Sequence, residues 1–372
     1  MTETSAQTVP VLFNELPLRQ GGIALQVVLN APRTLNALSL AMIQRIQPRL
    51  DAARNDPQVK VVLLQGSGEK AFCAGGDVVE LCHAIRRGDQ QLPETYFSAE
   101  YRLDYTLHTF PKPVICWGSG IVMGGGMGLM NGSSHRVVTE RSMLAMPEVT
   151  IGLYPDVGGS WFLNHMPGQV GLFLALTGSR LNAADALLLG LADHYMDSAH
   201  LDNLIHHLQQ ADWDQHSNHA VVSQVLAHVA RMPYPDLPLT SNVLQHFGLI
   251  QQLMHDLDPC VLREKLEDLA SDDAWLQRAL QTIQHGSPLA MRLIQQQLAR
   301  CRHLSLKSVF QAELALSVQI CRQGDFAEGV RALLVDKDNK PQWRFGSLTE
   351  VPVAFVEAFF ASPWEVNPLA DL

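Results

Sequence analysis

The sequence predicts an α/β fold whose C-terminal part is mainly α-helical. A unit of apolar run, turn and helical stretch recurs about every fifty residues in the first half of the chain. After about Asp197 this alternation stops, and nearly all of the remaining sequence has helical periodicity. The 372 residues are 47% hydrophobic and 17% charged, so the chain has enough apolar material for a substantial core.

The first half of the chain contains the predicted strands and the helices that follow them. Residues 59–64 are apolar except for Lys60, which is typical of a strand buried on both faces. Ser39 and Asp77 each precede a helical stretch and are suitable N-caps. The predicted strands are 22–29, 59–64, 114–117, 136–139 and 143–146, and the predicted helices are 38–53, 78–85 and 127–130.

The second half has a different character. Residues 200–230 are polar and helical, and 244–323 are almost entirely amphipathic helix, with Ser287-Pro288 marking a helix start. A charged turn at 336–343 and a last apolar segment at 351–360 follow. We therefore divide the chain into an α/β core, 1–197, and a mainly α-helical C-terminal region, 198–372.

Composition and charge exclude several classes of function. A formal net charge of −10 argues against nucleic acid or an anionic membrane as the main partner. The six cysteines are scattered without C-x-x-C spacing, so reduced thiols are expected. Residues 1–7 are polar and lack the features of a signal peptide, and no run reaches the roughly eighteen apolar residues of a membrane span. We therefore expect a soluble, cytoplasmic protein.

Two glycine-rich turns carry most of the functional information: AFCAGGD at 71–77 and MGGGMG at 123–128. Glycine lacks a Cβ, so each turn can present backbone N–H groups to a ligand. Two such donors aimed at one point form an oxyanion hole, which stabilises charge on a carbonyl oxygen. No Gly-Lys-Ser/Thr follows the triplet, and the local glycine spacing misses the dinucleotide fingerprint by one residue. The turns therefore favour acyl chemistry over phosphate binding; a tight turn without a ligand is the alternative.

Two carboxylates lie just downstream of these turns. Glu148 and Asp156 each follow a proline in an otherwise apolar stretch, where burying a charge is costly. Either one alone could be a helix cap or a salt-bridge partner. Because both occur within a few residues of each other, the pattern favours acid, base or nucleophilic chemistry.

Other candidate groups are weaker. Cys73 lies between Phe and Ala without a charged neighbour in sequence, so we expect a buried thiol rather than a nucleophile. His206-His207 and His216-x-x-His219 lack partners at ligand spacing, so we predict a solvated face and no metal site. The sequence also has no Gly-x-Ser-x-Gly elbow of a serine hydrolase.

These motifs resemble those of the crotonase superfamily, whose members bind acyl-CoA thioesters. The resemblance covers about residues 25–197, through Asn-Ala-Leu-Ser at 36–39, both glycine turns and Pro147-Glu148. It implies a spiral of ββα units with C-terminal helices, and residues 1–197 as the acyl-CoA-binding catalytic core. It also implies an oxyanion hole made by the backbone N–H groups of Gly76 and Gly125.

Within the superfamily, the chain departs from the hydratases and resembles a group of thioester hydrolases. Hydratases hold a water between two glutamates; here the first of these positions is Gly128 and the second is Glu148. The resemblance to the hydrolases continues through GLYPDVGG at 152–159, LALTG at 174–178, EGVRA at 328–332 and DKD at 336–338. It implies hydrolysis of 3-hydroxyisobutyryl-CoA to 3-hydroxyisobutyrate and coenzyme A, a step of valine breakdown.

The resemblance also implies roles for individual residues. Glu148 is the nucleophile or general base, and Asp156 orients the 3-hydroxyl group or the water. Glu100 and Gly124 bind substrate, and Arg33 is a candidate contact to coenzyme A. No metal or cofactor is expected beyond the coenzyme A of the substrate, and the implied assembly is a trimer or hexamer. The alternatives are an enoyl-CoA hydratase/isomerase-type lyase acting on another acyl-CoA, and a non-catalytic acyl-CoA-binding subunit.

Overall fold

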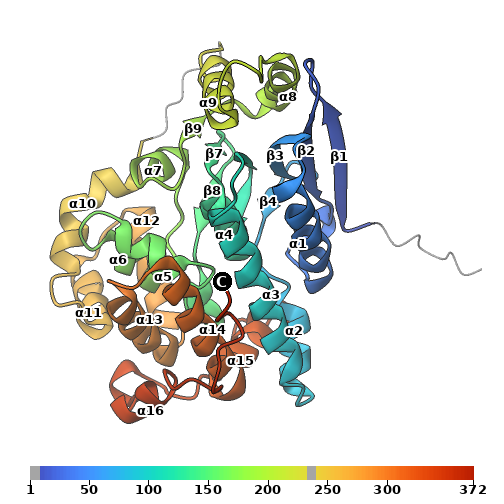
Figure 1. Ribbon diagram of the computed structural model, residues 1–372. Coiled ribbons are helices and arrows are strands. Elements are labelled where there is room, and N and C mark those ends of the chain that lie inside the picture. The colour runs from blue at the N-terminus through green and yellow to red at the C-terminus, as the bar shows by residue number, and fades with distance from the viewer. Residues whose placement is uncertain (1–8, 233–239) are drawn as a thin grey trace, which may run out of the picture.

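The computed structural model describes residues 9–232 and 240–372 (Figure 1). The polar segment 1–7 lies outside the described residues. The strands are β1 (Val11–Pro17), β2 (Ile23–Leu29), β3 (Val59–Gly66), β4 (Ala71–Cys73), β5 (Val114–Gly118), β6 (Ile121–Met123), β7 (His135–Val138), β8 (Met143–Ala145) and β9 (His194–Tyr195). The helices of the first half are α1 (Leu40–Asn55), α2 (Val78–Arg86), α3 (Gln91–His108), α4 (Gly125–Gly132), α5 (Gly159–Phe162), α6 (Val170–Thr177) and α7 (Ala183–Leu188).

The helices of the second half follow in an almost unbroken series. They are α8 (Leu201–Gln210), α9 (Asn218–Val229), α10 (Asn242–Leu253), α11 (Pro259–Leu269), α12 (Ala274–His285), α13 (Pro288–Cys301), α14 (Leu306–Gln323), α15 (Phe326–Val330) and α16 (Val353–Ala358). Residues 211–217 interrupt the stretch predicted as helical at 200–230.

Two sheets are built by alternate strands. One has the order β1-β2-β3-β5-β7-β9 and the other β4-β6-β8. The pair β1 and β2 is antiparallel, and the other pairs are parallel. Each of the successive pairs β3/β4, β5/β6 and β7/β8 gives one strand to each sheet before helical chain follows. The predicted spiral of ββα units is confirmed.

Strand β3, inside the larger sheet, is buried on both faces, which explains its apolar run. Val62 and Leu64 belong to the main core, whereas Val61 and Leu63 belong to a second core together with side chains of α8 and α9. Alternate side chains of a strand point to opposite faces, so both faces of β3 must be apolar. In Figure 1, α8 and α9 lie together at the top, apart from the other C-terminal helices.

The C-terminal helices share a core with the α/β part. The main cluster of buried side chains contains Leu25 and Tyr101 as well as Phe310 and Leu314 of α14, which packs against α3. One hydrophobic cluster therefore joins the two parts of the chain. The division at residue 197 stays a prediction.

Helix α3 is the main element that the sequence did not predict. Its buried face includes the carboxylates Glu100 and Asp104 beside aromatic and aliphatic residues, so it lacks the clean separation of polar and apolar faces that marks a surface helix. By contrast, both predicted N-caps are confirmed: the side chain of Ser39 accepts from the N–H of Met42, and that of Asp77 from the N–H of Glu80.

Candidate active site

The two glycine turns meet at a cavity of about 560 Å³. Its walls come from segments far apart in the sequence, including both turns, α3 and a turn near the C-terminus. The lining residues that the sequence analysis proposed for the site are Gly76, Glu100, Gly124, Gly125, Glu148 and Asp156. A second cavity of similar volume, lined chiefly by residues of α1 and α3, contains neither turn.

The two turns bring Gly76 and Gly125 close together. Gly124 has φ +47° and ψ −121°, which a residue with a Cβ rarely adopts, and this conformation starts α4 at Gly125. As the first residue of α4, Gly125 has no intrahelical acceptor for its N–H. In the bridge between Leu38 and Gly76, the N–H of Leu38 donates to the carbonyl of Gly75, and the N–H of Asp77 donates to the carbonyl of Leu38. The N–H of Gly76 takes no part in this bridge. A Cβ on Gly125 would lie 3.5 Å from the nitrogen of Gly76.

Glu148 lies beside Gly124, at the start of the second turn. It begins a 3₁₀ turn, Glu148–Ile151, and its Oε1 would be 3.0 Å from a Cβ on Gly124. Its Oε2 is buried and has no hydrogen-bond partner among the described residues. Burial raises the pKa of Glu148 well above its usual value, and the charge of Asp156 raises it further. A carboxylate without a protein partner is available to a bound substrate.

Asp156 and Glu100 each receive a hydrogen bond from a tyrosine of α3. The hydroxyl of Tyr101 donates to Asp156 Oδ2 at 2.6 Å, and that of Tyr96 donates to Glu100 Oε1 at 3.2 Å. Burial raises the pKa of Asp156 to about 6, and the hydrogen bond from Tyr101 acts in the opposite direction. Burial raises the pKa of Glu100 well above its usual value, and the charge of Asp156 adds to this rise.

The space beside Gly128 is already filled. A Cβ at this position would lie 2.7 Å from Val157 Cβ and 2.8 Å from Asp104 Oδ2. Asp104 is fully buried, and within residues 9–232 and 240–372 neither carboxyl oxygen has a hydrogen-bond partner. Burial therefore raises the pKa of Asp104 well above its usual value. A glutamate cannot be accommodated at 128 unless α3 or the Val157 turn moves.

Glu313 of α14 is a buried carboxylate that sequence reasoning missed. It accepts hydrogen bonds from the N–H of Gly158 at 2.8 Å and of Ser160 at 2.9 Å, and thereby fixes the turn after Asp156. Burial raises the pKa of Glu313 to about 8, although these two hydrogen bonds lower it. The signal was available: Glu313 is a lone carboxylate in a largely apolar helical stretch, the same pattern that singled out Glu148.

Two further lining residues come from the C-terminal region. Leu333 and Leu334 lie in a π-helical turn, Arg331–Val335, and both are 39% exposed. π-Helical turns are rare and often occur at functional sites. Leucines that are half exposed at a cavity offer apolar surface to a ligand.

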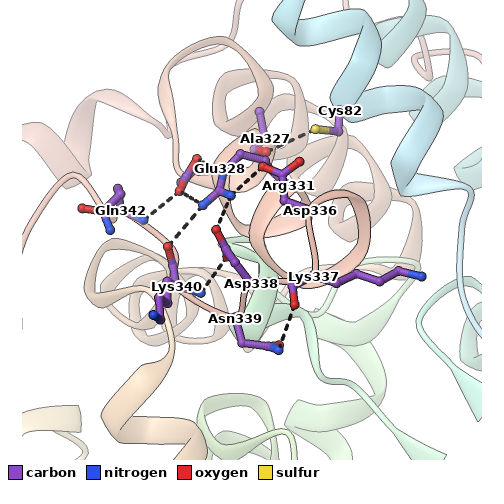
Figure 2. Close-up of polar contacts among 10 residues, drawn as sticks. All are labelled: Cys82, Ala327, Glu328, Arg331, Asp336, Lys337, Asp338, Asn339, Lys340 and Gln342. Atoms are coloured by element: carbon purple, nitrogen blue, oxygen red, sulfur yellow. Dashed lines mark hydrogen bonds and ion pairs between the residues drawn. The ribbon is translucent and has the colours of Figure 1, made fainter.

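A cluster of ion pairs around Arg331 fixes this turn. The guanidinium group donates to both carboxylate oxygens of Glu328, at 2.9 and 2.7 Å, and to Asp336 and Asp338, each at 2.7 Å (Figure 2). Lys337 points away from this cluster. The cluster thus ties α15 to the loop beyond the π-helical turn, and its four charged residues come from the EGVRA and DKD motifs that the sequence analysis had singled out.

Some of the predicted residues stand apart from the cavity. Arg33 is exposed and does not line it, although the adjacent Thr34 does. Cys73 is buried, and burial raises the pKa of its thiol to about 12, so it is a neutral side chain at pH 7. Among the described residues, no group of three or more His, Cys, Asp or Glu side chains is placed to hold a metal ion.

Comparisons with known proteins agree on the family. The model of the enoyl-CoA hydratase/isomerase family matches residues 24–360. The mitochondrial 3-hydroxyisobutyryl-CoA hydrolase of Gallus gallus is 39% identical over 342 residues, which are 92% of this chain and 87% of the relative. The mitochondrial human protein of the same name is 35% identical over 338 residues, covering 91% and 86%. 3-Hydroxyisobutyryl-CoA hydrolase 1 of Arabidopsis thaliana is 35% identical over 357 residues, covering 90% and 88%.

Two solved structures are similar over nearly the full length. A carnitinyl-CoA dehydratase from Mycobacterium thermoresistibile has a TM-score of 0.85 and 34% identity, covering 97% of this chain and 99% of that one. An enoyl-CoA hydratase from Rhodobacter sphaeroides has a TM-score of 0.82 and 31% identity, covering 95% and 98%. Their names describe hydration chemistry, so likeness of fold does not by itself choose the reaction.

The prediction of a cytoplasmic protein is wrong in the light of these relatives. The hydrolases of Gallus gallus, Danio rerio and Homo sapiens are all named as mitochondrial. The prediction rested on the scattered cysteines, the polar residues 1–7 and the lack of a long apolar run, none of which identifies the compartment in which a folded enzyme of this family works. Separately, no helix in the described part of the chain combines the length and apolar character that a membrane span requires.

Proposed function

The chain belongs to the enoyl-CoA hydratase/isomerase family, and we propose that it hydrolyses 3-hydroxyisobutyryl-CoA to 3-hydroxyisobutyrate and free coenzyme A in the breakdown of valine. Relatives that carry this activity in their names are 35–39% identical over most of their length and support this assignment. They favour it over the hydratase-type and the non-catalytic alternatives. The reaction needs no cofactor other than the coenzyme A of the substrate.

The observation that carries the proposal is one carboxylate beside two backbone N–H groups. Hydration across a double bond would use a second glutamate at position 128, but that position is glycine, and Asp104 and Val157 occupy the space around it. Glu148 lines the same cavity as Gly76 and Gly125, and its Oε1 would be 3.0 Å from a Cβ on the adjacent Gly124. This arrangement suits attack on a thioester carbonyl.

In the proposed reaction the thioester oxygen accepts hydrogen bonds from Gly76 and Gly125. These donors stabilise the negative charge that develops on the oxygen, and the start of α4 adds the partial positive charge of a helix N-terminus. Such fixed donors act strongly in a cavity that excludes water. Glu100 and Gly124, which line the same wall, contact the acyl group in this arrangement.

Glu148 has two routes. It either attacks the carbonyl carbon and forms a mixed anhydride, or takes a proton from a water that attacks directly. Asp156 orients the attacking water or the 3-hydroxyl group. A single turnover in ¹⁸O-labelled water tests for the first route. Label found in the carboxyl group of Glu148 requires the anhydride.

The phosphates of coenzyme A extend out of the cavity in this proposal. Arg33 is exposed next to Thr34 at the rim, and is the cation that we assign to them. The proposed assembly is a trimer or hexamer of this chain, and sedimentation of the purified protein tests it.

The first experiment combines purified protein with (S)-3-hydroxyisobutyryl-CoA and follows free thiol with a chromogenic reagent, after subtraction of a protein-only blank. We expect rapid thiol release that is abolished in Glu148→Ala, while coenzyme A still binds. Simultaneous loss of hydrolysis and binding would make Glu148 a structural residue. No release by the wild-type protein would reject the hydrolase assignment, and loss of the conjugated absorbance of crotonyl-CoA without thiol release would instead identify a hydratase.

A further inference from the structure

Three buried hydroxyl groups connect Asp156 to the backbone of α14. Tyr101 lies 2.6 Å from Asp156 Oδ2, and the Oγ of Ser317 lies 2.7 Å from the hydroxyl of Tyr101. Tyr154 lies 2.9 Å from Ser317 Oγ and donates to the backbone carbonyl of Glu313 at 2.8 Å. The four side chains Tyr101, Tyr154, Asp156 and Ser317 are all buried. We call the hydroxyls of Tyr101, Ser317 and Tyr154 the hydroxyl chain.

The direction in which the hydrogen bonds of the hydroxyl chain run, from donor to acceptor, depends on whether Asp156 carries a proton. When Asp156 is ionised, Tyr101 donates to it, Ser317 donates to Tyr101, and the hydroxyl of Tyr154 is shared between Ser317 and the carbonyl of Glu313. When Asp156 is protonated, it donates to Tyr101, Tyr101 to Ser317, Ser317 to Tyr154, and Tyr154 to the carbonyl. Each hydroxyl has an acceptor in both states, because a hydroxyl can donate and accept.

We propose that Tyr101, Ser317 and Tyr154 form a reversible hydrogen-bond chain that makes Asp156 the carboxyl group which gains and loses a proton during turnover. An unpaired donor in a dry interior is costly, so a buried acid exchanges its proton readily only where both states are hydrogen-bonded. The three hydroxyl residues are positioning residues, since they act on the substrate through Asp156. The role in turnover rests on the proposed thioester hydrolysis.

The other buried carboxyl groups lack such a chain. Glu148 Oε2 and both oxygens of Asp104 have no hydrogen-bond partner in the described part of the protein. Glu313 accepts from two backbone N–H groups, which cannot reverse their direction, and interacts with a single rotatable hydroxyl, that of Ser160. Glu100 has the single donor Tyr96, whose hydroxyl also lies 2.8 Å from the carbonyl of Leu38. Only Asp156 among these buried carboxyls is linked to several rotatable hydroxyls in series.

The electrostatic surroundings agree with this assignment. The titratable groups that interact with Asp156 come from several elements, namely Tyr96, Glu100, Tyr101 and Asp104 of α3, Glu148, Tyr154, and Glu313 and Cys321 of α14. Burial raises the pKa values of Glu100, Asp104 and Glu148 well above their usual range, and it raises that of Asp156 to about 6. A pKa of about 6 lets Asp156 exchange its proton near neutral pH.

The proton balance of the proposed hydrolysis uses this exchange twice. Protonated Asp156 gives its proton to the departing thiolate; its O–H bond breaks and the S–H bond of free coenzyme A forms. On the anhydride route, ionised Asp156 then takes a proton from the water whose oxygen joins the acyl carbon, which restores the O–H bond. On the direct route, Glu148 takes that proton from the water, and Asp156 regains its own proton from Glu148. The hydroxyls only rotate, and no proton leaves the hydroxyl chain.

Two substitutions in the hydroxyl chain should shift the titration of Asp156 in opposite directions. Tyr101→Phe removes the donor to the carboxylate, so the pKa of Asp156 should rise. Ser317→Ala removes the hydroxyl to which Tyr101 donates when Asp156 is protonated. Tyr101 then has only the carboxyl group of Asp156 as an acceptor in the chain. Because this penalises protonated Asp156, its pKa should fall. We expect each shift to be about one pH unit, and Ser317→Thr, which keeps the hydroxyl, should titrate like the wild-type protein.

Infrared difference spectroscopy of the substrate-free protein tests this directly. The proton on Asp156 is reported by the carboxyl band that titrates near neutral pH and is absent in Asp156→Asn. In each variant, the acidic limb of the plot of kcat against pH should shift together with the titration of this band. Shifts in the same direction in both variants, or no shift in either, would overturn the proposal. If Tyr101→Phe does not fold, the comparison of Ser317→Ala with Ser317→Thr still decides. Because the infrared titration needs no turnover, failure of the hydrolase assignment would be seen separately, in the thiol assay.

Discussion

Replacing Gly125 by alanine is the most direct test of the oxyanion hole. The added Cβ would lie 2.5 Å from Oε1 of Glu100, well inside normal contact, and 3.5 Å from the nitrogen of Gly76. Glu100 is buried and accepts a hydrogen bond from Tyr96, which opposes its withdrawal. Either the Glu100 carboxyl or the start of α4 must move, and movement of α4 displaces the N–H of Gly125.

The expected loss can be set against the stability change of the same substitution. Displacing one oxyanion donor costs about 3–4 kcal/mol of transition-state stabilisation, so kcat should fall about 10²–10³-fold. Alanine in place of glycine in a helix favours folding by up to about 1 kcal/mol, which offsets part of the cost of moving the Glu100 carboxyl away from the added Cβ. The effect should therefore appear in turnover far more than in unfolding.

The assay is the thiol-release measurement with a matched glycine as control. Gly248 lies within α10, and a Cβ there would meet no atom within 4 Å. Gly248→Ala should keep wild-type kcat and be equally or more stable. A Gly125→Ala protein that unfolds at the wild-type temperature and turns over at the wild-type rate would refute the assignment of Gly125 to the oxyanion hole.

Four further predictions follow from the site and its supports. Glu148→Gln, which keeps the shape but removes the charge, should lower kcat at least 100-fold with KM nearly unchanged, as measured by initial rates. Leu334→Ala should raise KM about fivefold at constant kcat, because about 1 kcal/mol of apolar contact is lost, whereas Leu304→Ala, at a similarly exposed leucine outside the cavity, should change neither constant. Arg331→Met should also raise KM, and adding Leu334→Ala to it should cause little further rise; full additivity would mean that the ion pairs do not position the turn. Glu313 has a pKa of about 8 in the folded state against about 4.3 in the unfolded state, so its contribution to the free energy of unfolding falls as pH rises between these values. Glu313→Gln should therefore make the free energy of unfolding, measured by urea titration, depend less on pH in this range. An unchanged pH dependence would contradict the raised pKa of Glu313.

Local patterns in the sequence were sufficient for the two glycine turns, the Ser39 and Asp77 caps, and the strands β2, β3, β5, β7 and β8. The apolar run at 59–64 predicted a strand buried on both faces, and the structure has it between two cores. Helix α3 escaped prediction because its buried face carries carboxylates, which is the feature that makes it part of the candidate site. The three-residue strands β4 and β6 are too short to show a period of two in the sequence.

The sequence by itself determined the glycine turns, the acyl-CoA family and the pair Glu148 and Asp156, because these depend on residues close together in the chain. The tertiary structure alone decided that Ser317 supports Asp156 through Tyr101, that Asp104 fills the space at Gly128, and that Leu334 lines the cavity. These contacts join α3 or the C-terminal segments to turns far away in sequence. They arise because a shared hydrophobic core packs α14 against α3, and no local pattern records which distant side chains that packing brings together.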